Sequence, residues 1–76
     1  MATQPGTIYR TTELVGTSNI GFDDAVKRAV DRAQKTLRNL AWFEVHEQRG
    51  RLTDGRIEYQ VTLAVGFALE DTMARP

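Results

Sequence analysis

The stretch from Arg56 to Glu70, RIEYQVTLAVGFALE, alternates more regularly than any other part of the chain. Successive side chains of a β-strand point to opposite faces, so this alternation predicts a strand with one buried face. The apolar face carries Ile57, Tyr59, Val61, Leu63, Val65, Phe67 and Leu69, and the other carries Glu58, Gln60, Thr62, Ala64, Gly66 and Ala68. Such a strand needs a covering layer, because an apolar sheet face must pack against another element.

One helix is predicted to supply that layer. Residues 22–40 repeat apolar side chains at helical spacing, and the stripe consists of Val26, Val30, Ala33, Leu37 and Leu40 with Ala25 and Ala29 beside it. Asp24 stands four residues before Arg28, and Asp31 four before Lys35, which predicts two ion pairs along the helix. Gly21 stands where a capping serine would be expected, so the start of the helix is weakly specified.

Two further strands complete the predicted domain. Residues 8–16 and 42–52 are rich in β-branched and aromatic side chains, and a turn at 53–55 leads into the strand described above. The order is strand, helix, strand, strand, which predicts an α+β fold with one helix on a three-stranded sheet. We expect a single domain over residues 1–76, with a loose N-terminus at 1–7 and a short tail at 71–76.

The size and charge of the chain indicate how the fold is stabilised and which partners it can bind. A chain of 76 residues buries only about 60% of its unfolded surface, and small folds commonly gain stability from disulfides, metals or oligomerisation. There is no cysteine and only one histidine, so oligomerisation is the expected route. Ten basic residues balance ten acidic ones, which argues against a duplex nucleic acid partner. The chain has neither a membrane-length apolar run nor a signal-peptide pattern, so we expect a cytoplasmic location.

The hairpin register decides where Trp42, the only tryptophan, points. A three-residue loop, 53–55, would pair Leu52 with Arg56 and place Phe43 and Val45 in the core. Trp42 would then lie opposite Gly66 on the face away from the helix, and Gln48 opposite Gln60. A bulge in the second strand would alter this register, and the stretch 49–51 is where we expect one.

Three roles remain open for the face that carries Trp42. An exposed aromatic without a covering helix needs a partner, and the simplest partner is another subunit. The indole could instead stack on a planar ligand whose edge bonds a glutamine. A third alternative is nucleic acid, with Trp42 stacking a base and four arginines, Arg38, Arg49, Arg51 and Arg56, contacting phosphates.

Three blocks of the sequence resemble the dodecins. These are ELVGTS at 13–18, TLRNLAWFEVHEQRGR at 36–51 and YQVTLAVGFALE at 59–70, and the likeness runs in order from about Ile8 to Glu70. The resemblance implies a three-stranded antiparallel sheet partly wrapping one helix, and a hollow homododecamer. It also implies that the protein is not an enzyme but stores and sequesters a flavin, FMN or riboflavin or FAD, with coenzyme A as a further ligand of some bacterial members.

The resemblance assigns three residues to the flavin site. Trp42 is expected to stack on the isoalloxazine ring and quench it, Gln60 to hydrogen-bond the pyrimidine edge, and Arg49 to contact the phosphate of FMN. Ala68 departs from the family, because bacterial relatives often carry arginine there, and we expect weaker or less selective FMN binding as a result. The alternative is an interaction module that uses the same face without a flavin.

Four other residues are not assigned to a site. His46 is expected to be a solvated strand residue, and Ser18 a loop or cap residue. Glu44 and Glu47 are expected on opposite faces, so they do not form a catalytic carboxylate pair. No constellation for metal binding or for acid–base or nucleophilic catalysis is visible in the sequence.

Overall fold

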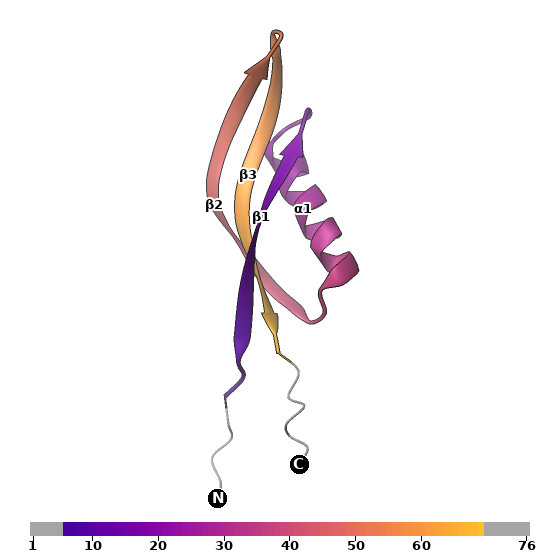
Figure 1. The fold of residues 1–76 in the computed structure, drawn as a ribbon, viewed down its shortest axis with the longest axis vertical. Coiled ribbons are helices and arrows are strands. Elements are labelled where there is room, and N and C mark those ends of the chain that lie inside the picture. Colours follow the sequence, from indigo (N-terminus) through magenta and orange to yellow (C-terminus); the bar gives the residue numbers. More distant parts are fainter. Residues whose placement is uncertain (1–5, 70–76) are drawn as a thin grey trace, which may run out of the picture.

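The computed structural model describes residues 6–69, so the predicted tail at 71–76 lies outside the described residues. The chain forms β1 (Tyr9–Ser18), α1 (Phe22–Thr36), β2 (Leu40–Thr53) and β3 (Arg56–Ala68), as Figure 1 shows. The predicted order and the α+β class are confirmed. The second strand is longer at both ends than predicted, and the first is displaced by one or two residues.

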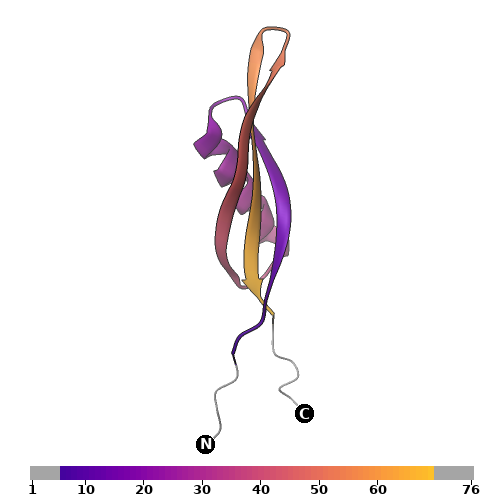
Figure 2. The same ribbon diagram turned by 90° about the vertical axis from the view of Figure 1, so that its left-hand side faces the viewer.

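The three strands form one antiparallel sheet in which β3 lies between β1 and β2. This order makes β3 the only strand with neighbours on both sides, which agrees with its regular alternation. The helix covers one face of the sheet (Figure 2), and the β2–β3 turn extends beyond it (Figure 1). The other face of the sheet has no covering element in the described chain.

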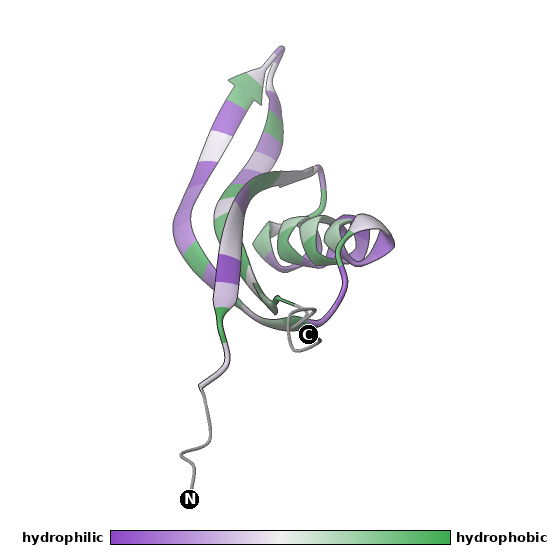
Figure 3. Ribbon diagram, turned by 60° about the horizontal axis from the view of Figure 1, so that its bottom comes forward, coloured by the Kyte–Doolittle hydropathy of each residue, from purple (hydrophilic) through white to green (hydrophobic). Residues whose placement is uncertain are grey.

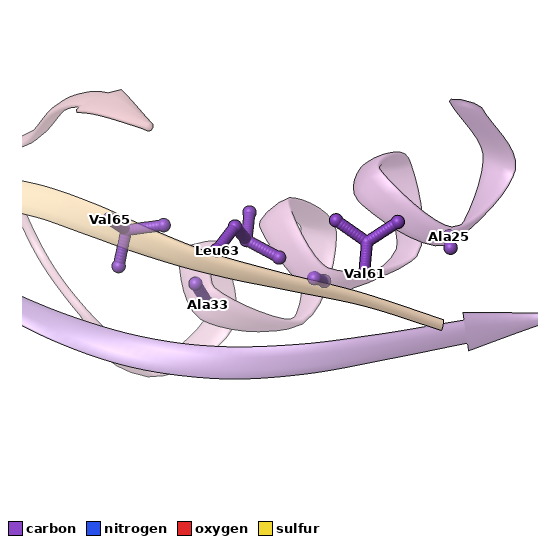
Figure 4. Close-up of a cluster of buried hydrophobic side chains, with 6 residues drawn as sticks. Ala25, Ala33, Val61, Leu63 and Val65 are labelled. Carbon is purple, nitrogen blue, oxygen red and sulfur yellow. The ribbon is translucent and has the colours of Figure 1, made fainter. Parts of the chain in front are cut away.

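The core lies between β3 and α1 (Figure 4). Its buried side chains are Val61, Leu63 and Val65 from the strand and Ala25, Ala29 and Ala33 from the helix. The predicted apolar face of β3 is therefore correct, but only its centre is buried. Ile57 is 48% exposed and Leu69 is 38% exposed, since both lie beyond the ends of the helix. Figure 3 shows the hydrophobic side of α1 turned to the sheet.

Alanines, rather than the predicted valines, form the centre of the helix contact. Val26 and Val30 are only partly buried, while the alanine column contacts the sheet. The helix lies so close to β1 that a Cβ on Gly16 would collide with the carbonyl oxygen of Ala25 and lie 2.9 Å from the Cβ of Ala29. Gly16 and the alanine column thus allow backbone-to-backbone packing that larger residues would prevent.

The helix ends earlier than its apolar stripe predicts. It stops at Thr36, and Asn39 adopts a left-handed conformation with φ of 61° in the connection to β2. Leu37 and Leu40 lie outside the helix, yet both still pack against the core. Their helical spacing was therefore an incorrect guide to secondary structure and a correct guide to burial.

The hairpin turn differs from the predicted three-residue loop. Thr53 pairs with Arg56, so only Asp54 and Gly55 form the turn, with φ of 51° and 76°. Two consecutive positive φ angles are typical of the type I′ turn, for which Asp-Gly is a favoured sequence. The predicted pairing of Leu52 with Arg56 is wrong, because Leu52 pairs with Ile57.

A bulge at His46 compensates for the shorter turn. The pairing shifts between Val45, opposite Leu63, and Glu47, opposite Thr62, which leaves His46 as the extra residue. The bulge lies outside the stretch 49–51 where it was expected. From Val45 back to Trp42 the predicted register holds, and Trp42 lies opposite Gly66. A second, unpredicted shift between Leu40 and Trp42 pairs Leu40 with Phe67. Between the bulge and the turn the faces are exchanged, so Arg49 rather than Gln48 lies opposite Gln60.

Candidate functional site

Trp42 lies on the sheet face opposite the helix, as predicted. Its neighbour Phe43 pairs with the buried Val65, while Trp42 pairs with Gly66 on the other side of the pleat. The indole lies directly on Gly66, since a Cβ on that glycine would collide with the indole ring. Tyr9 packs its ring edge-on to the indole, at a centroid distance of 5.0 Å and an angle of 63°. Trp42 nevertheless remains 43% exposed, so one side of the ring is available to a partner.

Gln60 lies on the same face, within a row of hydrogen bonds. Arg49 donates from Nε to Gln60 Oε1 at 2.8 Å, and Gln60 Nε2 donates to Glu58 Oε1 at 2.9 Å. The bulge at His46 creates this row, because it turns Arg49 to the face that carries Gln60. The structure therefore brings two of the three predicted site residues, Arg49 and Gln60, into direct contact.

Trp42 and Gln60 share a face but lie far apart on it. Their partners on β3, Gly66 and Gln60 itself, are separated by six residues. At about 3.4 Å per residue this separation is roughly 20 Å along the strand. A single planar ring cannot stack on Trp42 and bond Gln60 when both side chains come from one chain. The face between them carries the small side chains of Thr62 and Ala64.

His46 forms a polar cluster on this face, between the two ends of the candidate site. Its Nδ1 lies 3.4 Å from Glu13 Oε2, and its Nε2 lies 3.5 Å from Glu44 Oε1. His46 is an exposed residue of β2, as expected, and these contacts add to that role. Glu44 and Glu47 lie on the same face, opposite Ala64 and Thr62, so their predicted placement on opposite faces is wrong for the same reason, the bulge.

Ser18 is the last residue of β1 and not a loop residue, and the helix N-cap is Gly21, but the side chain of Ser18 organises the entry to the helix. Its side chain is buried, accepts hydrogen bonds from the backbone N–H groups of Ile20 and Gly21 at 2.9 and 3.4 Å, and donates to Asp24 Oδ2 at 2.7 Å. Arg28 donates from Nε to the same oxygen at 2.6 Å. The bond from Arg28, reinforced by Ser18, lowers the pKa of the Asp24 carboxyl from its ordinary value of 3.8.

The ion pairs of the helix are confirmed in one case only. Asp24 pairs with Arg28 as predicted, whereas Asp31 pairs with Lys27 at 3.2 Å rather than with Lys35. Both pairs lie on the exposed side of α1. They contribute little to a binding site on the opposite face of the sheet.

Two residues near the site were not identified from the sequence. Glu58 contacts Gln60, and Tyr9 contacts Trp42. Glu58 could have been found, because it lies two residues before Gln60 on a strand and so shares its face. Tyr9 could not, because the pairing of β1 with β3 that places it opposite Ala68 depends on the whole sheet.

The described residues contain no cluster of three or more acidic, histidine or cysteine side chains suited to a metal ion. None of the helices in this part of the chain has the length and apolar character needed to cross a membrane.

Comparison with known proteins agrees with this arrangement. Residues 8–70 match the family model described as Dodecin. A curated dodecin from Thermus thermophilus is 53% identical over 68 residues, which cover 88% of this chain and 99% of that protein. A solved structure from the same organism is 53% identical, with a TM-score of 0.80 over 86% of this chain and 97% of the other. The dodecin structure from Streptomyces coelicolor is 51% identical, with a TM-score of 0.82 over 88% and 97%.

The match covers all four elements of the fold and both ends of the candidate site. The chain belongs to the dodecin family.

Proposed function

We propose that this protein binds and stores a flavin, FMN or riboflavin, within a homododecamer. Trp42 stacks on the isoalloxazine ring, Gln60 bonds the pyrimidine edge, and Arg49 contacts the phosphate of FMN. The observation that carries the proposal is the exposed indole on its glycine platform, on the same sheet face as a glutamine whose carboxamide is already oriented. Aromatic rings stack readily on planar heterocycles, and carboxamides match the donors and acceptors of such an edge.

The site is proposed to be shared between subunits. Since roughly 20 Å separates Trp42 from Gln60 along β3, a ring that meets both needs the tryptophan of one copy and the glutamine of another. A two-fold axis through this face would bring Trp42 of each copy next to Gln60 of the other, which gives two equivalent sites at each contact. Two stacked flavins would then occupy each two-fold contact, and self-assembly would be a condition of binding.

The contacts of Arg49 leave it able to bind the phosphate of FMN. A guanidinium has five N–H donors, and the bond to Gln60 uses only Nε. The two terminal nitrogens therefore keep four donors for phosphate oxygens. For coenzyme A, the further ligand that the resemblance implies, no observation on the described residues indicates a position.

The proposed role is binding rather than turnover. Quenching of the excited flavin by Trp42 and exclusion of the ring from solvent both suit storage and sequestration. The competing proposal is an assembly that uses this face for protein contact alone, and a flavin titration separates the two.

The test is a fluorescence titration of FMN with the purified protein. Stacking on Trp42 should quench flavin emission strongly and saturate at a fixed ratio of flavin to chain. Trp42→Ala should abolish the quenching and leave the circular dichroism unchanged, because the indole lies outside the core. Emission that stays unchanged with an intact wild-type assembly would favour the protein-contact alternative.

A further inference from the structure

The hydrogen bonds around Gln60 distinguish the two ends of its carboxamide. Oε1 accepts from Arg49 Nε, and Nε2 donates to Glu58 Oε1. A guanidinium has only donors and a carboxylate has only acceptors. Rotation of the carboxamide by 180° would place donor against donor on one side and acceptor against acceptor on the other. The two charged neighbours therefore select one orientation of the amide.

In the selected orientation, the carboxamide of Gln60 keeps hydrogen-bonding groups that a ligand can use. One hydrogen of Nε2 and one lone pair of Oε1 remain after the bonds to Glu58 and Arg49 are counted. They give the carboxamide one donor and one acceptor for a ligand. The pyrimidine edge of a flavin offers the complement, an N3–H donor next to a carbonyl acceptor.

We propose that Glu58, together with Arg49, acts as a positioning residue that holds Gln60 ready for an imide edge such as that of the flavin. This inference rests on the proposed function and deepens it. A glutamine side chain loses considerable rotamer freedom when it is ordered, and a chain that is already held loses less on binding. Glu58 lies on the same strand as Gln60, two residues away, so their relative position is set by the strand itself.

The test compares lumiflavin with its N3-methyl derivative, because methylation removes the N3–H and neither compound has a phosphate. Wild-type protein should bind lumiflavin about tenfold more tightly, the value of one or two well-placed hydrogen bonds. Glu58→Ala should weaken lumiflavin binding several-fold and leave the affinity for the N3-methyl compound unchanged. The discrimination between the two compounds should therefore fall to about threefold or less.

Two variants control this result. Glu58→Gln keeps an acceptor oxygen at the same reach and should restore most of the discrimination. Glu47→Ala removes a carboxylate from the same face, opposite Thr62, where Glu47 has no hydrogen bond or ion pair among residues 6–69. It should leave both affinities at the wild-type level. The proposal would be overturned if Glu58→Ala weakened the binding of both compounds equally. It would also be overturned if Glu58→Gln discriminated between them no better than Glu58→Ala.

Arg49 provides a second readout of the same arrangement. If it also holds Gln60, Arg49→Ala should weaken lumiflavin binding several-fold although lumiflavin has no phosphate. An unchanged lumiflavin affinity would restrict Arg49 to the phosphate and overturn its positioning role. Failure of the wild type to bind lumiflavin at all would instead contradict the proposed function, so the two failures are distinguishable.

Discussion

At the scale of single residues, Trp42 and Gly66 form one unit. The indole can lie flat against the sheet only because its cross-strand neighbour has no side chain. Tyr9 packs against the indole, which nevertheless remains partly exposed, so a second ring can approach it. Residues from all three strands therefore determine the position of the indole on this face.

Ala68 lies on this face, opposite Tyr9, at the end of β3. A guanidinium introduced there would extend from the edge of the Trp42 site, where the phosphate of a stacked FMN could reach it. We predict that Ala68→Arg tightens FMN binding by about tenfold, the value of one charge-assisted hydrogen bond, and riboflavin binding much less. Fluorescence titrations with both flavins measure the difference. Equal increases in the affinities for FMN and riboflavin would exclude a phosphate contact as the cause.

Asp24 links the loop before the helix to the helix itself through Ser18 and Arg28. Its pKa is lowered in the folded protein chiefly by the bond from Arg28, so the ionised carboxylate stabilises the fold. The contribution is complete above the ordinary value of 3.8 and is lost as the pH falls below it, through the lowered pKa. Asp24→Asn should therefore lower the melting temperature at neutral pH.

The difference between wild type and Asp24→Asn should shrink as the pH falls below 3.8. Thermal melts of both proteins over a series of pH values check this. Asp31→Asn is the matched control, since Asp31 pairs with the exposed Lys27 and its loss should have a smaller effect. A difference that is independent of pH would contradict the assigned cause.

At the scale of elements, the sequence predicted the order of the strands and helix, the apolar face of β3, and the outward position of Trp42. Alternation and helical spacing are local signals, and they were sufficient for these features. Two errors occurred in the hairpin, a loop one residue too long and a bulge in the wrong place. Their effects cancel between Trp42 and Val45, so Trp42 and Phe43 were assigned to the correct faces.

The errors do not cancel between the bulge and the turn. There the true register turns Arg49 to Gln60 and Gln48 to the helix side, opposite Val61. The position of a bulge depends on twist and on contacts with β1, where Glu13 meets His46, and these are not encoded in the pattern of one strand. The contact between Arg49 and Gln60 was therefore not predictable from the sequence.

The close packing of α1 on β1 at Gly16 can be tested by adding one methyl group there. Gly16→Ala would insert a methyl group against the carbonyl oxygen of Ala25 and the Cβ of Ala29. Because backbone cannot move aside as a flexible side chain does, we predict a loss of about 1–3 kcal/mol in the free energy of unfolding.

Gly50→Ala is the matched control for that change, since the nearest atom to its added Cβ is the carbonyl oxygen of Glu58 at 3.9 Å. It should be neutral or slightly stabilising, because alanine reduces the freedom of the unfolded chain. Urea denaturation of the three proteins measures both effects. Equal stability of the two variants would contradict the close approach of helix and strand.

At the scale of the whole molecule, one helix leaves much of the sheet uncovered. Phe43 and Val45 lie on the helix side of β2, but the prediction that they join the core is wrong, because they are 50% and 37% exposed. They line a groove of about 510 Å³ beside α1. On the other face Val15 is 62% exposed, and at the hairpin Leu52 is 78% exposed. A chain of this size with so much exposed apolar surface is expected to be stable only as an oligomer, which agrees with its family.

The shared site is the central claim, and a mixed assembly tests it most directly. Trp42→Ala and Gln60→Ala chains are co-expressed in equal amounts, purified as assemblies, and titrated with FMN while emission is followed. Trp42→Ala alone should lack quenching sites, and Gln60→Ala alone should lack tight ones. With random assembly, half of the two-fold contacts pair one chain of each variant. If each flavin uses the indole of one chain and the carboxamide of its two-fold mate, each mixed contact has one intact site and one site without either residue. The mixed assembly should therefore regain about a quarter of the wild-type sites, whereas a mixed assembly with none would show that both residues must come from the same chain.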